Sequence, residues 1–150
     1  IIQRFSQWKQ QDYAARLALT PDELAKFLEP LTDAGVDIFH ASTRRFWEPE
    51  FPGSDLNLAG WTKKITGLPA ITVGSVGLKG VDFVHSLRNP GDASEVSDLG
   101  ELEARLARNE FDLVAVGRAL ISDANWVAKV RDGRTTELQP FSPEALKAFA

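Results

Sequence analysis

Two short segments of this 150-residue chain are apolar at almost every position: Ala70-Ile71-Thr72-Val73 and Leu113-Val114-Ala115-Val116. A strand with one solvent-exposed face alternates apolar and polar residues, whereas a continuous apolar run is typical of a parallel sheet that is covered on both faces. Neighbouring parallel strands need a crossover of about a dozen residues or more, which is usually a helix. The two segments therefore predict an α/β fold built on a parallel sheet.

Strand and helix patterns alternate along the whole sequence. Strands are predicted at residues 1–5, 37–41, 69–73 and 111–116. Helices are expected between Thr20 and Gly35, at 58–65, 98–107, 119–122 and 125–130, and from Ser142 onward. Residues 74–97 are expected to form a long connection, which in compact domains is usually functional or mobile.

The four strands, each followed by a helix, make four βα units. Two architectures fit this series: a small doubly wound sheet, or one half of a (β/α)8 barrel. The chain has no methionine and opens directly on an apolar run, so we expect it to be a piece of a longer, cut or engineered protein.

Composition excludes several classes of function. The chain has 17 basic and 21 acidic residues and a formal net charge of −4, whereas nucleic acids and anionic membrane surfaces attract basic proteins. No apolar run approaches the roughly 20 residues of a membrane-spanning helix, and no signal-peptide pattern opens the chain. Cysteine is absent, and His40 and His85 are too far apart for a local metal motif. We therefore expect a cytoplasmic protein that binds no nucleic acid, membrane or metal.

Glycine-containing turns follow the third and fourth predicted strands, at Gly74-Ser75-Val76-Gly77 and Gly117-Arg118. Glycine lets a backbone approach an anion closely, N–H groups at a helix start attract phosphate, and arginine adds a bidentate charge. In (β/α)8 barrels a phosphate often sits between the loops after the last two strands, beside a short extra helix. Each turn alone is compatible with an ordinary strand exit, but together they predict a phosphate site.

Three other polar features are weaker signals. Arg4, near the end of the first strand, is either a surface residue or a group that stabilises negative charge on a cofactor. His40 ends the second strand and is interpreted as a structural histidine with its hydrogen bonds satisfied. The loop Arg44-Arg45-Phe46-Trp47 either lines a substrate entrance or places Trp47 over the barrel end.

Four segments together resemble the Old Yellow Enzyme family of FMN-dependent NAD(P)H oxidoreductases, or ene-reductases. They are Arg4-Phe5-Ser6-Gln7-Trp8, Gly35-Val36-Asp37-Ile38-Phe39-His40, Ile71-Thr72-Val73-Gly74-Ser75-Val76-Gly77 and Asp112-Leu113-Val114-Ala115-Val116-Gly117-Arg118-Ala119-Leu120. The resemblance covers nearly the whole chain in order. It implies a (β/α)8 TIM barrel of which residues 1–150 supply the last four βα units, strands five to eight.

The resemblance also implies roles for individual residues. Arg4 matches the arginine that contacts the flavin near N1 and the C2 carbonyl, where it would stabilise the anionic reduced flavin. Gly74, Ser75, Gly117 and Arg118 match positions at the FMN phosphate. The family's substrate-binding histidine and asparagine residues and its proton-donating tyrosine come from the N-terminal half, so no catalytic residue is assigned in this chain.

The implied activity is transfer of hydride from NAD(P)H through FMN to the activated C=C bond of an α,β-unsaturated carbonyl compound such as an enone. It would require the missing N-terminal half-barrel, and the chain alone is expected to be inactive. An alternative is a non-catalytic half-barrel that associates with a second copy or a partner half, because unpaired strand edges and interior side chains would be exposed. A different phosphate-binding barrel is a third possibility.

Overall fold

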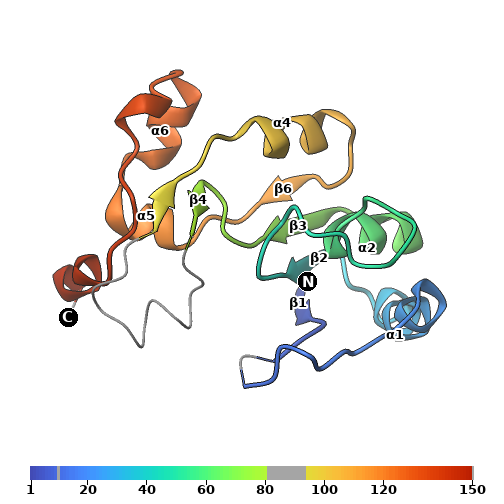
Figure 1. Cartoon of the computed structure of the whole chain (residues 1–150). Helices are drawn as coiled ribbons and strands as arrows, with labels where there is room; N and C mark the ends of the chain where they lie inside the picture. The colour runs from blue at the N-terminus through green and yellow to red at the C-terminus, as the bar shows by residue number, and fades with distance from the viewer. Residues whose placement is uncertain (10, 81–93, 150) are drawn as a thin grey trace. The chain divides into compact units, whose positions relative to one another are not determined.

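The computed structural model describes residues 1–9, 11–80 and 94–149. The chain divides into two compact units (Figure 1). The first unit comprises Ile1–Gly74 and Glu101–Ala115, and the second comprises Ser75–Gly100 and Val116–Ala150. His85, from the predicted long connection, lies outside the described residues.

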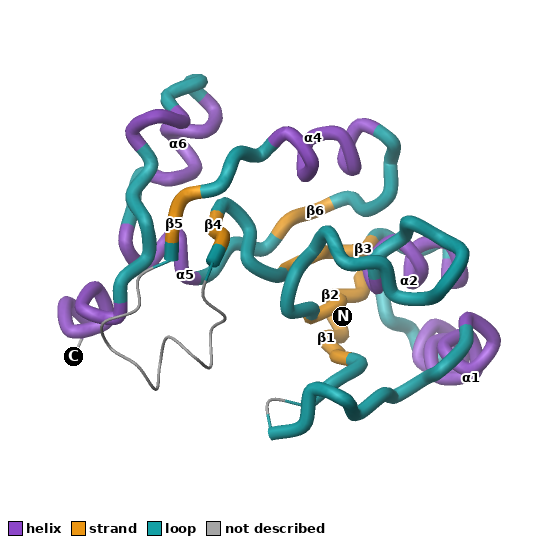
Figure 2. Tube along the Cα trace, viewed as in Figure 1, coloured by secondary structure: helices purple, strands orange, loops and turns teal. Residues whose placement is uncertain are grey.

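A four-stranded parallel sheet forms the centre of the first unit (Figure 2). Its strands are β1 (Ile2–Ser6), β2 (Ile38–Ser42), β3 (Ala70–Val73) and β6 (Leu113–Val114), hydrogen-bonded in the order β1-β2-β3-β6. The four predicted strands and their parallel pairing are confirmed, although β6 is shorter than expected. Among the described strands this order follows the chain without the reversal point that a complete doubly wound sheet has. The described sheet is therefore a parallel α/β sheet that is compatible with part of a barrel.

Two helices cover one face of this sheet. Helix α1 (Pro21–Asp33) begins as predicted, because the Thr20 side chain accepts a hydrogen bond from the backbone N–H of Glu23. Helix α2 (Leu58–Thr66) is capped by the Asn57 side chain and ends at Gly67, which has a left-handed conformation. Figure 1 shows α1 and α2 side by side, and α2 also contacts β2 and β3.

The pleat of the sheet places different residues on its two faces. The helix-covered face holds a buried row in which Phe5 pairs with Ala41, and Ala41 with Thr72. The other face carries Arg4, His40, Ile71 and Leu113, which are register partners across all four strands. On this second face Leu113 remains 50% exposed and Ile2 59% exposed. The sheet therefore presents a partly apolar face that the described residues leave half uncovered.

The second unit is built from short elements. They are β4 (Leu78–Lys79), β5 (Glu95–Val96), α5 (Arg118–Ser122), α6 (Trp126–Arg131) and two 3-10 helices at Thr135–Glu137 and Pro143–Phe149. Strands β4 and β5 pair antiparallel, so the described ends of the segment predicted as one long connection form a small ribbon. The tail helix after Ser142 is 3-10 rather than α. Helices α5 and α6 lie where they were predicted.

Asp123 joins α5, α6 and the tail of the second unit. Its side chain is buried and accepts hydrogen bonds from Lys129 Nζ at 2.8 Å and from the backbone N–H groups of Asn125 and Gln139 at 3.2 and 3.3 Å. Burial alone would raise the pKa of Asp123. The hydrogen bonds from Lys129 and Gln139, together with the Lys129 charge, outweigh burial and hold that pKa below its usual range.

This lowered pKa predicts an acid-dependent loss of stability. The Asp123 carboxylate stabilises the fold above its unfolded-state pKa of about 3.9, and this contribution is lost as the pH falls through the lower pKa of the folded state. The unfolding free energy should therefore fall with acidification below about pH 4. It should fall less steeply in Asp123→Asn, whose amide does not titrate. Urea titrations of both proteins across this pH range measure the two slopes, and equal slopes would contradict the assignment.

Candidate functional site

The turn after β3 has an unusual backbone. Gly74 has φ +141°, Ser75 has φ +50° and Gly77 has φ +70°. Positive φ is rare for a residue with a side chain, so Ser75 is held in a conformation that its neighbours must stabilise. A Cβ on Gly77 would lie 3.0 Å from the Trp126 ring, so this glycine lets α6 pack against the turn.

Gly74 is required by space as well as by conformation. A Cβ built on it would lie 2.7 Å from both the carbonyl oxygen and the Oγ1 atom of Thr43. The loop that follows β2 thus packs directly on the backbone at Gly74, and the Gly74 carbonyl accepts a hydrogen bond from Phe46 N–H.

Gly74→Ala should destabilise the chain by about 2–4 kcal/mol, because it combines positive-φ strain with an overpacked contact. Gly35→Ala is the matched control, since Gly35 has φ +96° but nothing lies within 4 Å of a Cβ built on it. The unfolding free energy of that variant should fall by only about 1–2 kcal/mol, because it carries the positive-φ strain without the overpacked contact. Urea denaturation of the two variants measures the difference. Equal losses would show that the close contact with Thr43 is unimportant.

Arg118 lies at the centre of a small polar cluster in the second unit. Its guanidinium donates to the hydroxyl oxygens of Ser75 and Ser94, both at 3.3 Å, and stacks over the Phe141 ring with 5.7 Å between Cζ and the ring centroid. Ser94 and Phe141 are fully buried, which fixes the base of this group. Three of the five predicted site residues, Ser75, Arg118 and its chain neighbour Gly117, are therefore brought together.

Gly117 stands at the start of α5 and has an open environment. Its φ of −109° is not a glycine-only value, and nothing lies within 4 Å of a Cβ built on it. Gly117 is therefore not required by packing, unlike Gly74. The arrangement of a guanidinium, a serine hydroxyl and an uncrowded glycine backbone has the donor chemistry that phosphate oxygens need.

Arg4 belongs to the first unit, near the carboxyl ends of β1 and β2. Its guanidinium donates to Ser42 Oγ at 3.0 Å and is exposed, while the Ser6 hydroxyl donates to the Ser42 carbonyl at 3.1 Å. This places a solvent-facing charge at the strand ends.

His40 is the register partner of Arg4. Burial lowers the pKa of His40, and the Arg4 charge lowers it further, so the imidazole is neutral at neutral pH. The prediction that its hydrogen bonds are satisfied is wrong for one atom. In the described part of the chain, His40 Nε2 is buried and has no hydrogen-bond partner.

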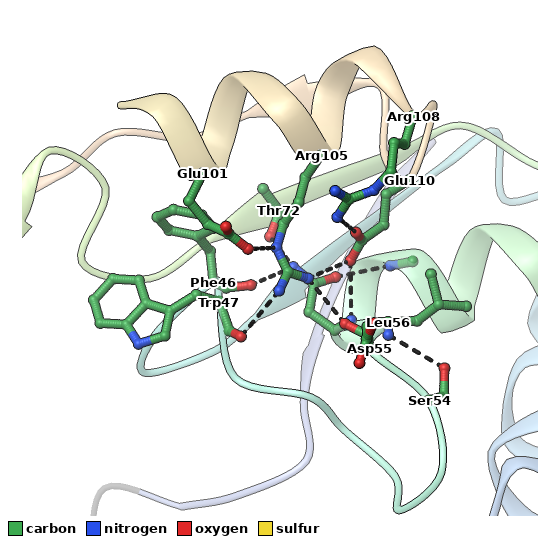
Figure 3. Close-up of polar contacts among 12 residues, drawn as sticks. Phe46, Trp47, Ser54, Asp55, Leu56, Thr72, Glu101, Arg105, Arg108 and Glu110 are labelled. Atoms are coloured by element: carbon green, nitrogen blue, oxygen red, sulfur yellow. Dashed lines mark hydrogen bonds and ion pairs between the residues drawn. The ribbon is translucent and has the colours of Figure 1, made fainter. Parts of the chain in front are cut away.

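A buried ionic network that the sequence did not reveal holds the loop after β2 (Figure 3). Arg105, from α4 (Gly100–Ala107), donates to Glu110 Oε1 at 2.9 Å and to Glu101 Oε1 at 2.7 Å, and Arg105 and Glu110 are both almost fully buried. Glu110 also accepts from the backbone N–H of Asn57, the cap of α2, at 3.0 Å.

The same network also forms hydrogen bonds with the backbone of that loop. Arg105 donates to the carbonyl oxygens of Trp47 and Asp55 at 3.1 and 3.0 Å, and Asn57 Nδ2 donates to the Phe46 carbonyl at 2.7 Å. Figure 3 shows the Arg105 guanidinium pointing between Trp47, Asp55 and Glu110. One arginine therefore fixes a loop that begins at the carboxyl end of β2.

Comparison with known proteins finds a distant relative. No protein-family model matches the chain. The chain is similar to an NADH oxidase from Thermoanaerobacter brockii, with 29% identity over 160 residues. The match covers 93% of this chain and 21% of that protein, so the chain spans about a fifth of its relative's length. This similarity is consistent with a fragment of an oxidoreductase.

Two observations bear on the expected partners. Across residues 1–9, 11–80 and 94–149, no helix is long and apolar enough to cross a membrane. Within those same ranges, no group of three or more histidine or acidic side chains is arranged to hold a metal ion.

Proposed function

We propose that this chain is the C-terminal half of a (β/α)8 flavin barrel and that it binds the phosphate of FMN through Ser75, Gly117 and Arg118. The observation that carries the proposal is the position of the Arg118 guanidinium, which bridges Ser75 and Ser94 beside the turn that follows β3. Both turns were expected at a phosphate from their place after the third and fourth strands. Gly74 contributes through the peptide that joins it to Ser75.

The sheet supports the barrel part of the proposal. Four parallel strands in unbroken chain order are what half of a (β/α)8 barrel contains, and helices on one face leave the other face for the barrel interior. The half-exposed Leu113 and Ile2 are the kind of side chains that a closed barrel would bury.

Each unit, taken by itself, carries a group with the chemistry that one part of FMN requires. Arg118 supplies a cation and Ser75 a hydroxyl for the phosphate, while Arg4 is an exposed cation held by Ser42. Following the resemblance, Arg4 would lie at the N1 and C2 carbonyl side of the flavin and stabilise negative charge there. Bound FMN would supply hydride transfer, with NAD(P)H as the reductant.

The similarity to an NADH oxidase supports an oxidoreductase that uses a nicotinamide nucleotide. We extend this to an FMN-dependent ene-reductase that acts on enones, completed by the N-terminal half-barrel, which would supply the proton donor and the carbonyl-binding groups. The expected location is the cytoplasm.

The second candidate is a half-barrel that associates with itself without catalysis. It is favoured by the half-exposed face of the sheet and by β1 and β6, each of which has one neighbour among the described strands. Two copies could complete each other's open edges, because exposed edges template pairing.

The test is a visible absorbance spectrum of the purified material together with its intact mass and its mass in solution. Flavin bands accompanied by a second polypeptide, followed by bleaching with NADH under anaerobic conditions and then enone reduction, would support the enzyme. A colourless dimer that takes up no added FMN would overturn it and support the second candidate.

A further inference from the structure

A groove in the first unit lies beside the amino-terminal ends of β3 and β6. Its volume is about 460 Å³, and the residues that matter for its chemistry are Leu56, Gly60, Lys63, Lys64, Arg108 and Glu110. Lys63 Nζ donates to Asp112 Oδ1 at 2.8 Å, and Asp112, directly before β6, accepts from the Ala70 N–H at the start of β3. The turn at Gly74 follows the opposite end of β3, so the groove is a different site from the glycine turns.

The floor of the groove is fixed by close packing on helix α2. A Cβ built on Gly60 would lie 2.7 Å from Glu110 Cγ and 3.2 Å from Leu56 Cδ2, so the missing side chain lets both residues approach the helix backbone. Glu110 Oε1 is held in turn by Arg105 and by the Asn57 N–H. A volume of about 460 Å³ falls within the range of roughly 300–1,000 Å³ that is typical of small-molecule pockets.

Two exposed cations stand at the rim of the groove. Lys64 Nζ lies over the Trp61 ring, 4.6 Å from its centroid, and an Arg108 guanidinium nitrogen lies 3.6 Å from Glu110 Oε2 (Figure 3). An ammonium and a guanidinium each carry several N–H donors, and each of these contacts engages only part of its group. Both side chains can therefore donate to a further acceptor while they keep their present contacts.

The charges around the groove leave a surplus of one positive charge. Among the described residues, the charged groups that line it, together with those joined to them in a chain of ion pairs, are four cations and three carboxylates: Lys63, Lys64, Arg105, Arg108, Glu101, Glu110 and Asp112. This count treats every cation as partnered where the structure pairs it. The chain as a whole carries a net charge of −4, so the local surplus is opposite in sign. Such a balance favours a ligand with a single negative charge.

We propose that this groove binds a small organic carboxylate, a molecule with one negative charge and an apolar body. Its carboxylate accepts hydrogen bonds from Lys64 and Arg108, and its apolar body lies on Leu56 and on the backbone of Gly60. A phosphate dianion would exceed the local surplus of positive charge. The inference is independent of the proposed function: barrel enzymes react at the carboxyl ends of their strands, so a ligand at the amino-terminal ends is an effector and not the substrate.

The experiment titrates the nitrogen-15-labelled full chain, without FMN, separately with 4-phenylbutyrate and with its neutral analogue 4-phenylbutyramide. The Trp61 indole N–H signal is followed by NMR, because a ligand that binds Lys64 changes the surroundings of the ring beneath it. The carboxylate should shift this signal saturably and bind at least about tenfold more tightly than the amide, the effect of one charge-assisted hydrogen bond. The indole signal of Trp126, which belongs to the second unit, should not move.

Variants separate this site from a general charge effect. Lys64→Gln and Arg108→Gln should each weaken 4-phenylbutyrate binding by about tenfold. Both side chains are exposed, so both variants should fold. Lys26→Gln removes an equal charge at an exposed position on α1 and should leave the affinity unchanged. Affinities are compared, and not the sizes of the shifts, because Lys64→Gln itself changes the contact with Trp61.

Two further probes test the kind of ligand. Phenyl phosphate, a dianion at pH 8, and a tetraglutamate peptide should each bind less tightly than 4-phenylbutyrate. Tighter binding of phenyl phosphate would reject the monoanion, and tighter binding of the peptide would make the groove a docking surface for an acidic segment. No saturable shift with the carboxylate, equal affinity for the amide or equal weakening by Lys26→Gln would overturn the site altogether.

Discussion

Replacing Arg105 with alanine is expected to destabilise the chain by about 3–5 kcal/mol, the usual loss when one partner of a buried ion pair is removed. Glu110 is only 6% exposed, so the change leaves its carboxylate buried without the cation that pairs with it. Burial alone would lower the pKa of Arg105, but its hydrogen bonds with Glu101 and Glu110 and their negative charges raise it, so the guanidinium stays charged. The variant also loses the donors to Trp47 and Asp55 that hold the loop after β2.

Arg108→Ala is the matched control for this prediction. Arg108 also approaches Glu110, at 3.6 Å, but its side chain is 58% exposed, so its removal should change the unfolding free energy by no more than about 1 kcal/mol. Urea denaturation of the two variants under identical conditions measures both effects. Similar small losses would mean that the buried pair contributes little beyond an exposed one.

Replacing Arg118 with alanine is expected to weaken FMN binding by between about tenfold and about a hundredfold. A hydrogen bond to a charged group is worth about 1.5–3 kcal/mol, and each 1.4 kcal/mol corresponds to about a factor of ten in affinity. The variant should bind riboflavin, which lacks the phosphate, as well as the unmodified chain does. Isothermal titration with both ligands separates loss of the phosphate contact from general damage to the second unit.

Two further variants sharpen the Arg118 result. Arg118→Lys keeps a positive charge but lacks the planar guanidinium. Its affinity for FMN should therefore lie between that of the alanine variant and that of the unmodified chain. Arg131→Ala, which removes an exposed cation elsewhere in the second unit, should bind FMN normally. If Arg118→Ala lowered FMN and riboflavin affinity equally, the arginine would be a structural residue of the second unit and not a phosphate ligand.

The sheet was predictable from the sequence because its signals are local. The apolar run at residues 70–73 identified β3, and the cap at Thr20 with the stop at Gly35 bounded α1. The glycine turns were also visible, and the positive φ values of Gly74 and Gly77 are what glycine permits at such turns. The order of the strands depends on contacts between residues far apart in the sequence, so the sequence alone left it open between a doubly wound sheet and a half-barrel.

The buried ionic network was beyond sequence reasoning because its partners are distant along the chain. Leu99, Leu102 and Leu106 recur at helical spacing around α4, which is typical of a buried face, yet Leu106 is 36% exposed and Arg105 is buried instead. The Glu101–Arg105 spacing of four residues gave only the ordinary signal of a surface helix pair. Nothing in the sequence indicated that Arg105 would reach the loop carbonyls at Trp47 and Asp55, which lie 58 and 50 residues earlier.

The most direct test of the central claim is a calorimetric comparison of FMN and riboflavin binding to the unmodified chain. The two ligands share the same ring and differ only in the phosphate, and Ser75, Gly117 and Arg118 all belong to the second unit of this chain. We predict that FMN binds at least about tenfold more tightly than riboflavin, the minimum expected from one charge-assisted hydrogen bond. Equal affinities, or no binding of either ligand, would contradict a phosphate site at this turn.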